Sequence, residues 1–185
     1  MWPERPGRTG PYALFPPLPY LQWACQVWLS YPVTVWPKAR QMAMTWLFAS
    51  LYLGDALFLG GRLNLIQSRD QVASTHVLRR MRGVYERMRG MAPWLVPDLR
   101  KSNESMLEFV NGSVLLSVPQ GAHYFQSYTP SGGLFDEAQL QDEIAKAVEY
   151  AGACCERITL VGSADYGWLY QVVLQDLVGQ QEASP

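Results

Sequence analysis

The chain has 185 residues, of which 49% are hydrophobic and 17% are charged, and its formal net charge is −1. This length and composition predict a single globular domain with a buried core, and they exclude a disordered chain. Because the net charge is close to zero, any contact with nucleic acid must come from a local basic patch. The three cysteines, Cys25, Cys154 and Cys155, show no metal-ligand spacing and favour a reducing compartment.

The first 32 residues form an aromatic and proline-rich arm, in which we expect one short helix near 21–30. Repeated prolines would break any apolar helix before it, so no secretory signal is expected. A buried strand is predicted at 33–36, followed by a loop and an apolar helix at 45–57. That helix is too short to span a membrane and contains Asp55, so we interpret it as a buried helix.

The second half of the chain alternates between strand and helix patterns. A strand at 63–66 precedes a long helix, which Ser68 or Asp70 can cap. The apolar face of that helix consists of Val77, Met81, Val84 and Met88. Asn111-Gly112 predicts a hairpin between strands at 106–110 and 114–118. Further elements are expected in the order of a strand ending at Asp136, a helix at 140–152, a strand at 158–164 and a helix from Tyr166. This alternation predicts an α/β fold, with a mainly parallel central sheet and helices on both of its faces.

Residues 38–45, Lys-Ala-Arg-Gln-Met-Ala-Met-Thr, are similar to a phosphate-binding loop. When they are aligned with the G-x-x-x-x-G-K-[ST] pattern, Ala43 takes the place of the second glycine and Met44 that of the lysine. Lys38 takes the place of the first glycine, and Thr45 keeps the hydroxyl that would coordinate magnesium. Downstream, one apolar strand ends in the carboxylates of residues 136–137 and another ends at Ser163. A loop, an acidic strand end and a small polar strand end, in this order, are typical of an ATP motor.

Phosphoryl transfer requires positioning and charge neutralisation from a protein. Backbone amides of the loop, together with a helix N-terminus, would form the phosphate cradle. Asp136 would hold magnesium with Thr45, and Glu137 would polarise the attacking water as a general base. The alternative interpretation is that Lys38 is a solvated lysine at a strand end and that residues 136–137 are ordinary charges at a helix start.

The loop resembles the variant form K-x-R-Q-x-G-x-[ST] of the large terminase subunit, the DNA-packaging motor of tailed bacteriophages, except at Ala43. Segments 46–57, 111–113 and 127–137 add to the resemblance, which extends from about Tyr20 to Val173. It implies the fold of a P-loop NTPase and an ATP hydrolase that uses ATP and magnesium.

The same resemblance implies roles for individual residues. Lys38 would bind the phosphates from the other side of the loop and act in catalysis with Glu137, Gln22 would read the adenine edge, and Ser163 would couple hydrolysis to movement. The nucleotide-binding residues would be Lys38, Ala39, Arg40, Gln41, Met42, Ala43, Met44, Thr45 and Gln22.

The resemblance also implies partners and a domain division. We expect weak binding of double-stranded DNA by the isolated chain, a ring on a capsid portal, and contacts with a small terminase subunit and a separate nuclease half. The expected place is the host cell cytoplasm, for a phage or prophage protein, without a membrane contact. Residues 1–32 would be an arm, 33–179 the ATPase domain and 180–185 a frayed tail, and a nuclease domain is expected to be absent.

Two further interpretations remain open. The first is a split or weakened terminase remnant that binds nucleotide or acts structurally, and it is favoured by three departures from the family's pattern, at Ala43, Met44 and Gln126. The second is another P-loop motor, such as a helicase. The predicted long helix carries a group of arginines that forms either a solvated face or a surface for DNA or a neighbouring subunit. The group consists of Arg79, Arg80, Arg82, Arg87 and Arg89.

Overall fold

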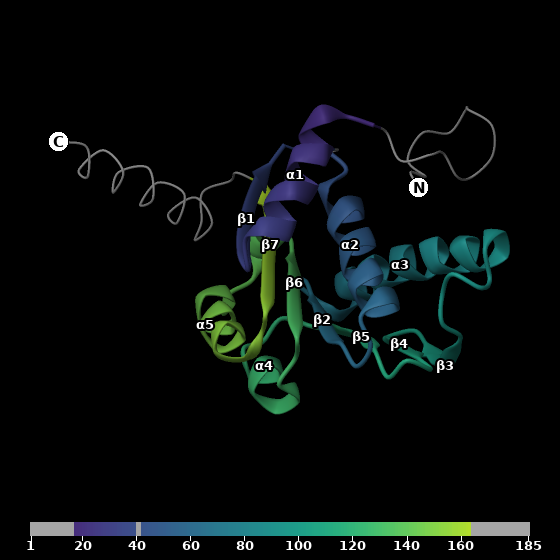
Figure 1. Cartoon of the computed structure of the whole chain (residues 1–185). Coiled ribbons are helices and arrows are strands. Elements are labelled where there is room, and N and C mark those ends of the chain that lie inside the picture. Colours follow the sequence, from purple (N-terminus) through teal and green to yellow (C-terminus); the bar gives the residue numbers. More distant parts are fainter. Residues whose placement is uncertain (1–16, 40–41, 164–185) are drawn as a thin grey trace.

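The computed structural model describes residues 17–39 and 42–163 (Figure 1). The helices are α1 (Pro19–Ser30), α2 (Met44–Phe58), α3 (Gln71–Met91), α4 (His123–Tyr128) and α5 (Ile144–Cys154), with a 3₁₀ turn at Ala138–Leu140. The strands are β1 (Val33–Lys38), β2 (Leu63–Gln67), β3 (Leu99–Asn103), β4 (Met106–Phe109), β5 (Val114–Val118), β6 (Gly132–Asp136) and β7 (Arg157–Ser163).

The strands form one seven-stranded sheet in the order β1-β7-β6-β2-β5-β4-β3. The neighbours from β1 to β5 in this order are all parallel. Strands β4 and β3 extend the sheet in antiparallel fashion, and the β4–β5 pair is the hairpin that Asn111-Gly112 predicted. The predicted mainly parallel α/β fold is confirmed.

Helices cover both faces of the sheet, because successive strand residues point to opposite sides. Ile66 and Leu134 pack in a core with α1, α2 and α3. Their neighbours Leu65 and Phe135 pack in a second core with α4 and α5. Figure 1 shows α5 and α4 on one side of the central strands and α1 and α2 on the other. The sheet is therefore buried on both faces, as its continuous apolar strands require.

Two helices match their sequence predictions closely. Helix α2 buries residues all around its circumference, among them Phe48, Tyr52 and Ala56, and it is the predicted buried helix. In the described part of the chain, no helix is both long and apolar enough to cross a membrane. Asp70 caps α3 by accepting a hydrogen bond from the Ala73 amide at 2.7 Å.

Three local differences separate the structure from the sequence prediction. Strand β3 was not predicted, because its Arg100, Lys101 and Ser102 are polar and exposed and show no apolar alternation. The short helix α4 was also missed. Helix α5 starts at Ile144 and not near residue 140, because the 3₁₀ turn intervenes. The helix predicted from Tyr166 lies outside the described residues.

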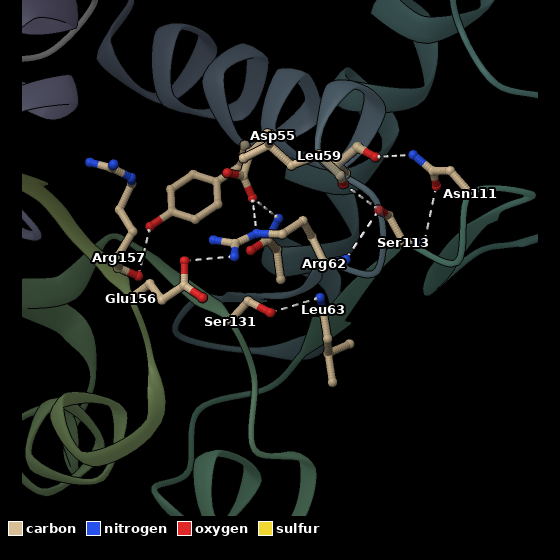
Figure 2. A network of polar contacts seen from close by, with 12 residues as sticks. Asp55, Leu59, Arg62, Leu63, Asn111, Ser113, Ser131, Glu156 and Arg157 are labelled. Carbon is tan, nitrogen blue, oxygen red and sulfur yellow. Dashed lines mark hydrogen bonds and ion pairs between the residues drawn. The ribbon is translucent and has the colours of Figure 1, made fainter.

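A polar network joins the amino ends of the parallel strands to the end of α2 (Figure 2). The Asp55 carboxylate accepts hydrogen bonds from Arg62 Nε at 3.1 Å and from Asn64 Nδ2 at 2.9 Å. Arg62 Nη1 also pairs with Glu156 Oε2 at 2.7 Å, just before β7. Ser113, before β5, donates to the Leu59 carbonyl at 2.9 Å. These contacts fix the turns at this edge of the sheet, which we call the amino edge.

Candidate functional site

Three predicted site residues end neighbouring parallel strands at the opposite edge of the sheet, which we call the carboxyl edge. Lys38 ends β1 and is in register with Ser163, the last residue of β7. Asp136 ends β6, the strand that pairs with β7 on the side opposite to β1. In open α/β sheets this edge is where ligands bind. The structure therefore places Lys38, Ser163 and Asp136 at the same edge of three neighbouring strands.

The Thr45 hydroxyl donates a hydrogen bond to Asp136 Oδ1 at 2.8 Å. Thr45 lies in the first turn of α2, and both side chains are buried, with 9% and 8% of their surface exposed. Burial raises the pKa of Asp136 above its ordinary value, whereas the Thr45 hydrogen bond and the charges of Lys38 and Arg80 act to lower it. The ionised carboxylate is thus costly in the free protein, and a bound cation would compensate that cost.

Thr45 and Asp136 are the residues that fit a magnesium ion here. A hydroxyl and a carboxylate are the oxygen ligands that this cation prefers, together with water and substrate phosphates. Among the described residues there is no group of three or more His, Cys, Asp or Glu side chains that could hold a metal. A magnesium ion held by Thr45 and Asp136 would complete its coordination with water and with oxygens of a substrate, as is usual for magnesium–nucleotide complexes.

Glu137 follows Asp136 in a left-handed backbone conformation, with φ of 51°. The Glu137 Oε2 atom lies 3.4 Å from Arg69 Nε. Arg69 also lies 3.3 Å from Asp70 Oδ2 at the start of α3. The predicted general base is therefore held by an arginine that sequence reasoning did not identify. Arg69 follows β2, far from Glu137 in sequence, so no local pattern connects the two.

The described end of the loop between β1 and α2 contains a left-handed residue. Ala43, in the place of the second glycine, has φ of 58° and is the N-cap of α2. The Met42 carbonyl accepts a hydrogen bond from the Tyr20 hydroxyl at 3.0 Å, so α1 anchors the loop. Met44 is buried, with 5% of its surface exposed, and supplies no charge to this loop. Arg40 and Gln41 lie outside the described residues.

A cleft of about 300 Å³ lies beside the two carboxylates, with one wall from the start of α3. Its charged residues come from the loop before α3, from α3 and from the end of β6, and they include both acids and bases. The cleft is lined by Arg69, Asp70, Val72, Ala73, His76, Val77, Arg80, Asp136 and Glu137.

Two glutamines of the 3₁₀ turn region support the strand ends and were not predicted. Gln139 Oε1 accepts a hydrogen bond from the Ser163 amide at 3.1 Å. Gln141 Nε2 donates to the Asp136 carbonyl at 2.9 Å. Single glutamines after an acidic strand end give no sequence signal for such contacts. Gln22, predicted to read adenine, is exposed in the first turn of α1, and its role stays a prediction.

Most of the α3 arginines contact other parts of the same chain. The Arg80 guanidinium stacks over the Trp46 ring, with 5.3 Å from Cζ to the centroid. Arg82 donates to the Asn103 carbonyl, and Arg89 pairs with Asp98. These contacts favour a structural role for much of the group, and Arg79 is exposed on the same helix.

No protein-family model matches the chain, and neither does any curated protein sequence. Solved structures do match. The large terminase of bacteriophage HK97 aligns with a TM-score of 0.66 at 15% identity, over 94% of this chain and 38% of that one. The large terminase ATPase domain of Thermus phage P74-26 aligns with a TM-score of 0.54 at 12% identity, over 75% of this chain and 62% of that one.

A third match is the large terminase of another thermophilic bacteriophage, with a TM-score of 0.60 at 13% identity. The alignment covers 86% of this chain and 41% of that one. The same terminase in complex with ADP aligns with a TM-score of 0.52. The chain thus spans between 37% and 62% of the length of the matched chains. The resemblance that the sequence suggested is confirmed at the level of structure: the chain has the fold of the ATPase domain of phage large terminases.

Proposed function

We propose that this chain is the ATPase motor domain of a viral large terminase subunit, which hydrolyses ATP with magnesium to drive DNA into a capsid. The observation that carries the proposal is the buried hydrogen bond between Thr45 and Asp136. It joins the first turn of α2, which follows the left-handed Ala43, to the end of a central parallel strand. Lys38 and Glu137 lie at the same edge. Binding of ADP by a solved terminase of this fold supports the choice of nucleotide.

Each residue has a distinct task in this proposal. Thr45 and Asp136 would hold the magnesium ion, which when bound neutralises phosphate charge and orients the nucleotide. Lys38 would bind the phosphates from the end of β1, because Met44 offers no charge. Glu137 would accept a proton from the attacking water. Arg69 would hold Glu137 in position, and Ser163 would couple hydrolysis to movement of β7.

The partners follow from the same proposal. We propose duplex DNA, a ring of subunits on a capsid portal, a small terminase subunit and a nuclease half, in the cytoplasm of a bacterial host. Because Arg80, Arg82 and Arg89 of α3 contact the chain itself, we expect the isolated domain to bind DNA weakly. Such binding should weaken further as the salt concentration rises.

A second candidate function is a nucleotide-binding or structural remnant of such a motor. It is favoured by two observations at the loop, the buried Met44 in the place of the lysine and the alanine at a left-handed position. An alanine there costs roughly 1 kcal/mol relative to glycine, which a functional loop tolerates. Replacement of the lysine is compensated if Lys38 binds the phosphates, so the motor remains the better account.

Substitution of Glu137 by Gln separates the two candidates. The variant should bind ATP as the wild type does, while phosphate release should fall by about 10²–10⁴-fold, the range of general-base catalysis. Phosphate release is measured at high protein concentration, because the isolated domain lacks a neighbouring subunit's arginine and should turn over slowly. If the wild type and Glu137→Gln bind ATP and release phosphate equally, the remnant is the correct interpretation.

A further inference from the structure

The carboxyl edge contains a cation whose task the proposed function does not assign. In the ordinary loop pattern a lysine occupies the position of Met44, which is buried here. Two positive charges act on Asp136 in this structure, Lys38 from β1 and Arg80 from α3. Lys38 was identified from the sequence, whereas Arg80 was only one member of a cluster of arginines.

Arg80 lies against both parts of the predicted phosphate site. It lines the cleft of about 300 Å³ that also contains Asp136 and Glu137. Its guanidinium stacks over Trp46, which directly follows Thr45 in the first turn of α2. A guanidinium stacked on an indole ring is held in a defined orientation. The guanidinium is thus positioned beside the metal-binding pair without belonging to the loop.

We propose that Arg80 binds the terminal phosphate of the nucleotide from α3, as a second cation beside Lys38. This inference rests on the proposed function, because it requires a nucleotide at the carboxyl edge. The terminal phosphate is the one that would lie next to the ion on Asp136 and the water on Glu137, and Arg80 shares a cleft with both residues. The planar donors of a guanidinium also match phosphate oxygens in pairs.

A purely structural role would give a different result. If Arg80 only neutralises Asp136 or packs on Trp46, its removal affects every nucleotide that binds with magnesium. If Arg80 binds the terminal phosphate, its removal weakens the binding of ATP and leaves the binding of ADP unchanged. The ratio of the two affinities therefore distinguishes a phosphate ligand from a supporting residue.

The experiment measures the affinities of ADP and of a non-hydrolysable β,γ-imido analogue of ATP by titration calorimetry with magnesium. Arg80→Ala should weaken binding of the ATP analogue by about tenfold or more, which is the low end of the range for loss of a hydrogen bond to a charged group. The affinity for ADP should change by less than about twofold. Arg80→Lys should also weaken binding of the ATP analogue, but less than Arg80→Ala does, because lysine keeps the charge. Arg79→Ala is the matched control, because Arg79 is the exposed neighbour on α3, and both affinities should stay at wild-type values.

Other outcomes overturn the inference in distinguishable ways. If Arg80→Ala weakens both nucleotides equally, or neither, the terminal phosphate is not its ligand, while the proposed function stands. A wild type that binds neither nucleotide contradicts the proposed function and, with it, the role of Arg80. Thermal unfolding of the free variants checks that they are folded. If Arg80→Ala is unfolded, Arg80→Gln, which keeps most of the methylene stem on Trp46, takes its place with the same expected ratio.

Discussion

The two edges of the sheet differ in how their polar groups are satisfied. At the amino edge, Asp55 accepts hydrogen bonds from two neighbours and Arg62 pairs with two carboxylates (Figure 2). At the carboxyl edge, burial raises the pKa of Asp136, and Ala43 and Glu137 hold left-handed backbone conformations. Thr129, between α4 and β6, is a third left-handed residue other than glycine and lies outside the carboxyl edge. Strain and costly charge cluster at functional sites. The amino edge therefore stabilises the fold, and the carboxyl edge is prepared for a ligand.

The largest effect should follow from breaking the amino edge. Asp55→Ala leaves Arg62 and the buried Asn64 without their shared acceptor, and should lower the free energy of unfolding by about 3 kcal/mol. Urea denaturation measures this loss. The matched control is Glu156→Ala, because Glu156 is 70% exposed and its pair with Arg62 contributes less than about 1 kcal/mol. A fall in ATP affinity of the folded Asp55→Ala protein would contradict the separation of the two edges.

Removal of the displaced lysine should act on the ligand and not on the fold. Lys38→Ala should weaken ATP binding by roughly 1.5–3 kcal/mol, the contribution of a charge-assisted hydrogen bond. Titration calorimetry provides the measurement. Met44→Leu is the suitable control, since Met44 is buried and an alanine there would create a destabilising cavity. Equal affinities of the wild type and Lys38→Ala would exclude Lys38 as the phosphate ligand.

The buried carboxylate predicts a dependence of stability on pH. Because the folded-state pKa of Asp136 is raised above its ordinary value of 3.8, the folded protein holds this proton more tightly than the unfolded chain. The stability from the bound proton is full below that ordinary value and is lost as the pH rises through the raised folded-state value. Asp136→Asn should therefore be more stable than the wild type near pH 7, with a smaller difference near pH 4, in urea unfolding at both conditions.

The same substitution should remove the magnesium dependence of ATP binding, because an amide is a poor ligand for this cation. If Asp136→Asn is more stable than the wild type near pH 7 and its ATP binding no longer depends on magnesium, Asp136 is retained for function and not for stability. If Asp136→Asn is less stable than the wild type near pH 7, the carboxylate has a structural role and the contrast between the edges is wrong.

The smallest effect is expected at the left-handed loop position. Ala43→Gly relieves a backbone cost of roughly 1 kcal/mol and loses a buried methyl group of similar value, so stability should change by less than about 1 kcal/mol. Thermal unfolding checks this near-cancellation. A loss of several kcal/mol would show that the alanine is required for packing and that the position is not strained.

Local sequence patterns predicted the residues that a single element places, and they missed those that tertiary contacts place. Thr45 and Asp136 were predicted as site residues because each follows a recognisable strand or loop signal. Arg69, Gln139 and Arg80 were not assigned, because their partners lie on other elements and the chain connecting them carries no periodic pattern. Strand β3 was missed for a related reason, since pairing with β4 and not apolar alternation makes it a strand.

The central claim is that the carboxyl edge binds a magnesium–nucleotide complex, and titration of ATP into the wild-type protein tests it most directly. The measurement is made once with magnesium and once with a chelator, and thermal unfolding confirms that the protein is folded in both. The account predicts saturable binding to one site per chain, which weakens when magnesium is removed. Absence of binding by the folded protein at millimolar ATP with magnesium would contradict it.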